Sequence, residues 1–331
     1  MSNQHKITIP NWQLSSGKSL KDVPLTYQIF GPAISAAPVV LVNHALTGNS
    51  NVSGPDGWWN TLIGPGKTID TTHFTVVAFN IPGNSYGSDF FIENYAAVTV
   101  ADVAALFWQG LKSLGVNSLF AIIGGSLGGG VTWHMAAQQP DKLQHLIPVA
   151  TDHKATDWVI ANVLVQDRIL NNSTSPVADA RLHAMLLYRT PQSLQERFER
   201  NYTNGAFAIE HWLNRHGKKL EERFALPAYK LMNHLLKTID VDLAVVAAHM
   251  GAAIHLVAVD TDLLFTPNET RKTFELLKAA GAEVCYNEIQ SAHGHDAFLI
   301  EHTQLAAILK PVFVIQNSVK VHKEDAKLHK V

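Results

Sequence analysis

The stretch Gly124-Gly125-Ser126-Leu127-Gly128-Gly129-Gly130 is the feature from which the rest of this sequence can be interpreted. The apolar run 119–123 before it predicts a buried strand, and the run 131–139 after it predicts a helix. Between a strand and a helix, Gly-x-Ser-x-Gly forms a tight, strained turn that exposes the serine as a nucleophile. The alternatives are a plain glycine-rich turn and a phosphate-binding loop, but no lysine follows as a phosphate loop requires. Ser126 is the candidate nucleophile if an acid and a histidine follow downstream.

Composition excludes several classes of function. The chain has 331 residues, of which 47% are hydrophobic and 16% charged, and its net charge is −2. This balance gives no basic surface for nucleic acid or an anionic membrane. The sequence begins without a secretory signal and contains no apolar run long enough to span a bilayer. Cys285 is the only cysteine, which excludes a disulfide framework and a cysteine metal site. We expect a cytoplasmic enzyme.

Strands and helices alternate through the first half of the chain. A helix is predicted over 98–114, with Thr99 as its cap and Gly115 as its stop. Strands are predicted over 6–9, 25–30, 38–42, 74–79, 119–123 and 143–150, the first two as an antiparallel pair. Such alternation predicts a mostly parallel sheet with both faces covered by helices.

The alternation stops between about 156 and 246, where only helix-like stretches such as 179–188, 192–200 and 228–236 occur. Their apolar faces predict an inserted helical subdomain rather than a linker. Beyond it we predict strands over 254–259 and 283–289 and helices over 270–279 and 297–309. The predicted organisation is a core in two parts (1–153 and 247–316), a helical lid insertion (154–246) and a polar C-terminal tail (317–331).

The last two predicted strands are followed by the residues that would complete a catalytic triad. Asp260 and Asp262 follow one strand, and His293 and His295 follow the other. Open parallel sheets bind ligands at the carboxyl ends of their strands, and Ser, Asp, His is the chain order of an α/β-hydrolase triad. Geometry favours Asp262, which is further from its strand, and His295, at the start of the predicted helix, but it leaves both choices open. The two histidines lack the acidic or cysteine partners of a metal site.

An oxyanion hole requires two backbone N–H groups near the serine. The residue after the nucleophile supplies one, here Leu127, and the loop after the 38–42 strand supplies the other, from Ala45 or Leu46. His44 in that loop is interpreted as a structural residue.

The chain resembles the homoserine O-acyltransferase family, the acetyl-CoA-dependent branch of the α/β-hydrolases that begins methionine synthesis. The resemblance covers about residues 38–300. It depends on several separate stretches, which are His44-Ala45-Leu46-Thr47-Gly48-Asn49, Gly57-Trp58-Trp59, Leu62-Ile63-Gly64-Pro65-Gly66, Gly124-Gly125-Ser126-Leu127-Gly128-Gly129, Thr261-Asp262-Leu263-Leu264-Phe265 and Gly294-His295-Asp296-Ala297-Phe298-Leu299.

The resemblance implies an α/β-hydrolase fold and chooses between the alternatives at the triad and the oxyanion hole. The acid matches Asp262, the base His295, and the oxyanion donors Leu46 and Leu127. It also implies acetyl-CoA, or another acyl-CoA, as co-substrate, with no bound cofactor and no metal. The implied partners are small molecules and a second copy of the chain, in a homodimer formed through the lid helices.

The resemblance further implies an acceptor site beside the serine. Arg181 and Tyr188 match a family pair seven residues apart, which places both on one face of a helix. The family arginine binds the carboxylate of the acceptor, and the aspartate that matches Asp296 binds its ammonium. From the residues alone, Arg181 could equally pair with a lid carboxylate.

The chain departs from the usual family pattern at Leu127, where methionine is usual, in the loop 82–90 and in the lid segment 166–170. Acetyl or succinyl as the acyl group, and homoserine or serine as the acceptor, therefore stay open. An esterase or thioesterase with the same triad is the alternative function, and a catalytically inactive binding module is a second.

Overall fold

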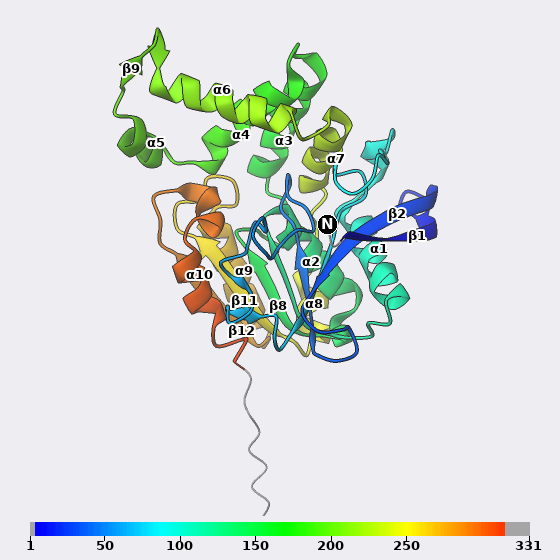
Figure 1. The fold of residues 1–331 in the computed structure, drawn as a ribbon. Helices are drawn as coiled ribbons and strands as arrows, with labels where there is room; N and C mark the ends of the chain where they lie inside the picture. The colour runs from blue at the N-terminus through cyan, green and yellow to red at the C-terminus, as the bar shows by residue number, and fades with distance from the viewer. Residues whose placement is uncertain (1–3, 315–331) are drawn as a thin grey trace, which may run out of the picture.

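The structure is a computed structural model that describes residues 4–314 (Figure 1). The predicted tail at 317–331 lies outside the described residues. The main sheet has the strand order β1-β2-β6-β3-β7-β8-β11-β12. β1 and β2 pair in antiparallel fashion, as predicted, β2 is antiparallel to β6, and every later pair is parallel. The strands are β1 (Gln4–Gln13), β2 (Ser19–Phe30), β3 (Val39–Asn43), β6 (Thr75–Phe79), β7 (Leu119–Gly125), β8 (Leu143–Val149), β11 (Ala253–Val259) and β12 (Val284–Ile289).

Both faces of the sheet are buried, which is why its central strands are continuous apolar runs. Leu41 faces one hydrophobic cluster, whereas its neighbours Val40 and Val42 face the other. The first cluster includes side chains of α1 (Val100–Ser113), α2 (Leu127–Gln138), α8 (Leu243–His249) and α9 (Pro267–Ala279). The second includes side chains of α10 (His302–Leu309) and of the segment 52–74, which holds the short pair β4 (Ile63–Gly64) and β5 (Ile69–Asp70). The mostly parallel sheet between helical layers confirms the predicted fold class.

The helix α1 begins and ends as predicted. Thr99 accepts a hydrogen bond from the backbone N–H of Asp102, and the Asp102 carboxylate accepts one from the N–H of Thr99. The same carboxylate accepts the N–H of Ser15 at 2.7 Å, which connects the turn after β1 to the helix. Gly115 follows with a φ of +76°, a conformation that favours glycine.

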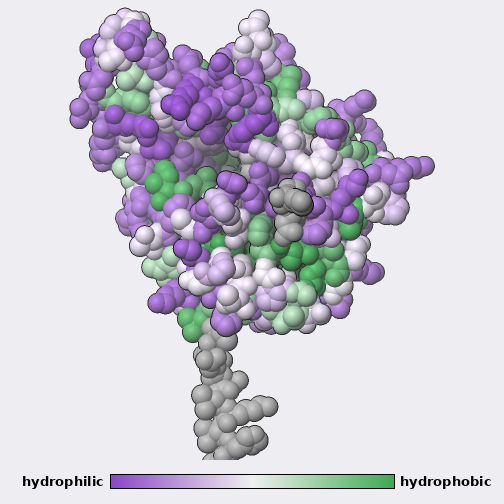
Figure 2. Space-filling view, in the orientation of Figure 1, coloured by the Kyte–Doolittle hydropathy of each residue, from purple (hydrophilic) through white to green (hydrophobic). Residues whose placement is uncertain are grey.

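The lid is inserted between β8 and β11 and lies over one end of the sheet (Figure 1). Its outer helix α6 presents charged side chains such as Arg215 and Lys218 to solvent, and Figure 2 shows a hydrophilic surface there. The predicted boundary at residue 246 falls inside α8, which packs against the core helices α2 and α9. The prediction that this region contains no strand was wrong, because β9 and β10 form a short antiparallel pair across the turn at Asn204-Gly205. The lid elements are α3 (Asp157–Asn172), α4 (Pro176–Tyr188), α5 (Pro191–Phe198), β9 (Tyr202–Thr203), β10 (Ala206–Phe207), α6 (Ala208–Glu221) and α7 (Leu226–Leu236).

Two predicted helices differ from the structure. α2 begins at Leu127 rather than residue 131, because the glycines after Ser126 are part of its first turn. The predicted helix 297–309 is divided into a 3₁₀ segment, η3 (Gly294–Leu299), and α10. In a 3₁₀ helix residues i and i+3 share a face, so His295 and Phe298 both point into the core, where they are 3% and 1% exposed. Short 3₁₀ turns also occur as η1 (Tyr95–Ala97) and η2 (Pro140–Lys142).

Within residues 4–314, no helix is both long enough and apolar enough to cross a membrane.

Candidate active site

Ser126 occupies a strained turn between β7 and α2. Its φ of +56° and ψ of −123° are unfavourable for a residue with a side chain. The surrounding backbone stabilises this conformation, because the Ser126 N–H donates to the Val149 carbonyl at 2.9 Å. Its own carbonyl accepts the N–H groups of Gly129 and Gly130 at 2.9 and 3.1 Å. The predicted nucleophile elbow is therefore present, directly at the start of a helix.

The glycines of the motif allow three segments to approach closely. A Cβ on Gly124 would lie 2.3 Å from the carbonyl oxygen of Gly128, and one on Gly128 would lie 2.2 Å from that of Asn43. Gly125 faces the Phe298 ring, 2.5 Å from where its Cβ would be. Side chains here would separate β3, β7 and α2, so these glycines are required by packing.

The structure brings Ser126, His295 and Asp262 together in one hydrogen-bonded line. His295 Nε2 lies 2.9 Å from Ser126 Oγ, and His295 Nδ1 donates to Asp262 Oδ2 at 2.6 Å. The other oxygen, Asp262 Oδ1, accepts the backbone N–H groups of Leu264 and Phe265 at 2.7 and 3.0 Å. These two bonds fix the carboxylate so that Oδ2 faces the imidazole. The three side chains belong to residues that are 5% exposed or less.

The two alternative residues lie elsewhere. Asp260 Oδ1 accepts the backbone N–H of Ser291 at 2.9 Å and so holds the loop that carries the histidines. His293 turns toward the lid, where its Nδ1 accepts hydrogen bonds from Ser193 Oγ and Arg189 Nη2 at 2.9 and 3.1 Å. Local geometry therefore distinguishes Asp262 from Asp260 and His295 from His293.

The surroundings of His295 favour its protonated form. Burial opposes protonation, but the neighbouring carboxylates of Asp262 and Asp296 raise the pKa of His295 above its usual value. Tyr188 and Phe298 pack against the imidazole with ring centroids 5.5 Å away, and Phe265 does so at 5.8 Å. A positive charge on His295 would thus be stabilised while water is excluded.

The two candidate oxyanion donors lie at a helix terminus and in an anchored loop. Leu127 is the first residue of α2, so its N–H belongs to the turn that lacks intrahelical partners. Leu46 follows β3 in a loop that His44 fixes. His44 Nδ1 donates to the Ala45 carbonyl at 2.8 Å, and its Nε2 accepts the Ile81 N–H at 3.0 Å. Burial lowers the pKa of His44 to about 4, so this anchor is neutral.

The predicted acceptor residues come from two elements, Arg181 and Tyr188 from the lid helix α4 and Asp296 from η3, directly after His295. Arg181 lies over Tyr188, with its Cζ atom 5.3 Å from the ring centroid, and both belong to α4. Burial raises the pKa of Asp296, and the charges of Arg181, His295 and Arg189 oppose that rise. The structure therefore brings Arg181, Tyr188 and Asp296 together beside the triad.

Sequence reasoning missed Arg189, a buried cation that directly follows Tyr188. Its Nη1 atom lies 4.0 Å from Asp296 Oδ2. An arginine directly after the apolar end of α4 was the available signal, but its partners His293 and Asp296 are more than 100 residues away in the sequence.

Comparison with known proteins identifies the fold and the family of the chain. The chain matches the alpha/beta hydrolase fold family over residues 38–209. The structure of homoserine O-acetyltransferase from Bacillus anthracis superposes with a TM-score of 0.84 at 19% identity, covering 95% of this chain and 98% of that one. Esterase E22 superposes equally well, with a TM-score of 0.84 at 17% identity and coverage of 94% and 99%. The class is therefore the α/β-hydrolase fold with a helical lid.

Sequence similarity identifies the branch of this class. Homoserine O-acetyltransferase of Salinibacter ruber is 32% identical over 334 aligned residues, which cover 89% of this chain and 93% of that protein. The chain belongs to the homoserine O-acetyltransferase family.

Proposed function

We propose that the protein is an O-acyltransferase that moves an acetyl group from acetyl-CoA to the hydroxyl of L-homoserine or a similar amino-acid alcohol. The observation that carries this proposal is the Ser126–His295–Asp262 line next to the opposite charges of Arg181 and Asp296. The triad alone would serve a hydrolase equally well. The paired charges suit a zwitterionic acceptor, whereas a hydrolase, whose acceptor is water, would not require them.

The proposed reaction has two half-reactions at one serine. In the first, His295 Nε2 takes the proton of Ser126 Oγ, which attacks the thioester carbonyl carbon. The tetrahedral oxyanion is held by the N–H groups of Leu46 and Leu127, and losing one such donor costs roughly 3 kcal/mol. The carbon–sulfur bond then breaks, and His295 returns the proton to the CoA sulfur.

In the second half-reaction the acceptor hydroxyl attacks the acetyl-serine. His295 takes the hydroxyl proton, the acetyl group passes to the acceptor oxygen, and the proton returns to Ser126. Arg181 holds the carboxylate of the acceptor as a charge-assisted pair, and Asp296 holds its ammonium. Asp262 stabilises the imidazolium in both steps without taking the proton.

The names of the curated relatives support acetyl over succinyl as the acyl group. The relatives from Salinibacter ruber and Symbiobacterium thermophilum, at 32% and 33% identity, are both homoserine O-acetyltransferases.

Release of CoA with and without L-homoserine tests the proposal. We expect slow release from acetyl-CoA alone and much faster release when L-homoserine is added, with O-acetylhomoserine detected by mass spectrometry. Succinyl-CoA should acylate the enzyme far more slowly than acetyl-CoA. Release that is indifferent to every amino-acid alcohol, together with hydrolysis of simple acetyl esters, would favour the esterase alternative instead.

The predicted homodimer and cytoplasmic location remain part of the proposal. Exposed apolar side chains on the lid helices α3 and α4, among them Trp158, Leu164 and Leu186, support an interface there. Sedimentation of the protein and of the Leu164→Glu variant tests it, since a dimer formed through the lid should dissociate in the variant.

A further inference from the structure

Arg189 is a buried cation whose Nε and Nη2 atoms both donate hydrogen bonds to neighbouring side chains. Its side chain is 9% exposed. Nε and Nη2 donate to Ser193 Oγ at 3.2 and 2.8 Å, and Nη2 also donates to His293 Nδ1 at 3.1 Å. Ser193 Oγ in turn donates to the same His293 nitrogen. The guanidinium is thus held by a lid helix on one side and by the loop before His295 on the other.

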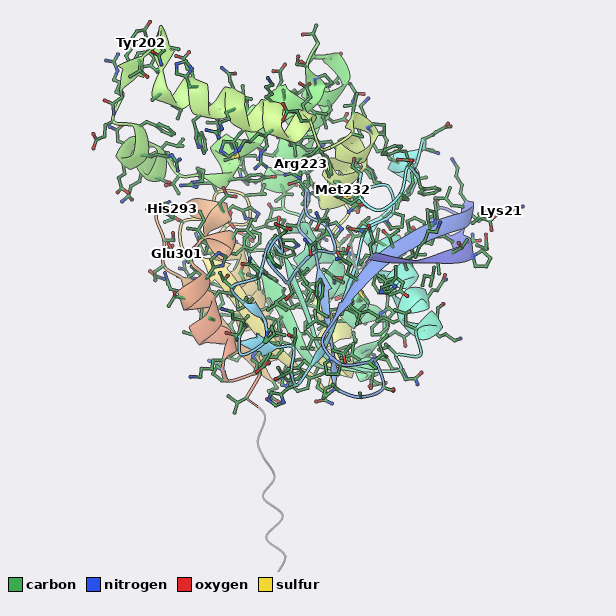
Figure 3. All side chains as sticks on the ribbon, viewed as in Figure 1. Lys21, Tyr202, Arg223, Met232, His293 and Glu301 are labelled. Carbon is green, nitrogen blue, oxygen red and sulfur yellow. The ribbon has the colours of Figure 1, made fainter. Side chains whose placement is uncertain are left out.

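The same junction is fixed by a second contact. The Thr190 hydroxyl donates to the carbonyl of Ala292, and a Cβ on Gly294 would lie 3.1 Å from the carbonyl oxygen of Tyr188. Figure 3 places His293 at the boundary between the lid and the C-terminal part of the core, which contains η3. The loop that presents His295 and Asp296 is therefore attached to the lid at the residues that follow α4.

The remaining nitrogen of Arg189 faces the acceptor site. Nη1 lies 4.0 Å from Asp296 Oδ2, and Asp296 is the carboxylate within ion-pair distance of Arg189 among the described residues. The charged and titratable groups around Asp296 are Arg181 and Tyr188 from α4, Arg189 after α4, its neighbour His295, and Asp262 after β11. Two of these are guanidinium groups, and they do not play the same part.

We propose that Arg189 is a positioning residue that holds Asp296 in place and ionised so that Asp296 can bind the ammonium of the acceptor. This inference rests on the proposed transfer to an amino-acid alcohol. Burial favours the neutral form of Asp296, and a neutral acid would hold an ammonium poorly. Arg181 is neutralised by the acceptor's carboxylate when the acceptor binds. Arg189, whose fork is occupied by Ser193 and His293, keeps its charge directed at Asp296 throughout.

A pair of acceptors that differ by one amino group tests the inference. L-Homoserine has the ammonium that Asp296 would hold, whereas 4-hydroxybutyrate lacks it and keeps the carboxylate and the hydroxyl. Arg189→Gln should lower kcat/KM for L-homoserine roughly 10- to 100-fold, mainly through KM. For 4-hydroxybutyrate the loss should stay within about threefold, as should acetylation of Ser126 by acetyl-CoA. A residue that only supports the lid would reduce transfer to both acceptors equally.

Three further variants make the test specific. Arg189→Lys keeps the charge and should recover part of the loss, and Ser193→Ala frees the guanidinium and should give a smaller loss of the same kind. Arg197→Gln is the matched control, because Arg197 is on the neighbouring α5 and lies over Trp212, 5.6 Å from its ring centroid. It should change neither acceptor's kcat/KM by more than about twofold.

The possible outcomes separate the inference from the proposed function. Wild-type transfer to L-homoserine with equal losses for both acceptors in Arg189→Gln overturns the inference alone, and so does no loss in either. A wild-type protein that transfers acetyl to neither acceptor overturns the proposed function, and the inference with it. If Arg189→Gln does not fold, as judged by circular dichroism, Ser193→Ala and Arg189→Lys replace it, since neither removes the charge. A loss confined to L-homoserine then supports the inference, and equal losses or no loss for the two acceptors overturn it.

Discussion

The core and the lid hold their functional side chains in different ways. In the core, Ser126, His295 and Asp262 are joined by short, directional hydrogen bonds, and backbone N–H groups fix the carboxylate. On the lid, Arg181 lies over an aromatic ring and acts on Asp296 through its charge. The proposed chemistry is thus fixed by geometry in the core, while the proposed acceptor is selected by charges on an inserted element. Changes in the core should affect both half-reactions, and changes in the lid only the second.

The largest effect is expected at the nucleophile. Ser126→Ala should abolish acetylation and transfer together, a loss of roughly 10⁶-fold in kcat. Mass spectrometry after incubation with acetyl-CoA should find one acetyl group on the wild-type peptide that contains Ser126 and none on the variant. An acetyl group on Cys285 or on a lysine would contradict the assignment.

The next effect separates the two aspartates of the core. Asp262→Asn should lower kcat by roughly 10⁴-fold, because the amide favours the wrong tautomer of His295. Asp260→Asn is the matched control, since Asp260 accepts a backbone N–H from Ser291 and does not contact the imidazole. It should lose less than about tenfold. Equal losses in steady-state assays would mean that the loop geometry, and not the acid, was disturbed.

A smaller and more selective effect is expected on the lid. Arg181→Ala removes a charge-assisted contact worth about 2–4 kcal/mol, so kcat/KM for L-homoserine should fall roughly 30- to 1000-fold. Stopped-flow acetylation of Ser126 should stay nearly intact, and slow hydrolysis of the acetyl-enzyme should become the main reaction. Equal losses in both half-reactions would remove the distinction between core and lid.

The smallest effect is a displacement along the pH axis. His295 acts as a base only when it is neutral, and its carboxylate neighbours raise its pKa above 6.5. The rate of acetylation should therefore begin to fall, on acidification, at a higher pH than an unperturbed histidine would give, and then by about tenfold per pH unit. Asp262→Asn should move this limb to lower pH. A wild-type limb below 6.5 would contradict the proposed environment of His295.

The core was largely predictable from sequence, for a physical reason. Its strands are buried on both faces, so runs such as Val39–Asn43 stand out from their surroundings. The start of α2 was not predictable, since its glycines ordinarily end helices. The fold requires glycine here, because a Cβ on Gly128 would lie 2.2 Å from the carbonyl oxygen of Asn43. That contact is visible only in three dimensions.

The lid and its contribution to the site were less predictable. The helix α6 is polar on its outer face. It places Gly217 against α4, next to Leu182, and no local sequence pattern predicts this contact. The role of Ser126 could be proposed from a motif, whereas Asp262 and His295 were chosen over Asp260 and His293 only through the family resemblance. The role of Arg189 could not be proposed, because its bond to His293 joins residues that are 104 positions apart in the sequence.

The buried histidine in the loop after β3 has a consequence for spectroscopy. His44 is neutral down to a pH of about 4, and its ring is hydrogen-bonded on both nitrogens to backbone groups. In a titration followed by nuclear magnetic resonance, its signals should stay fixed over the range in which His295 changes charge. The His44 signals can therefore serve as an internal reference for those of His295. A shift of the His295 signals alone would record its protonation, whereas a shift of both sets of signals would record a rearrangement of the loop that holds His44.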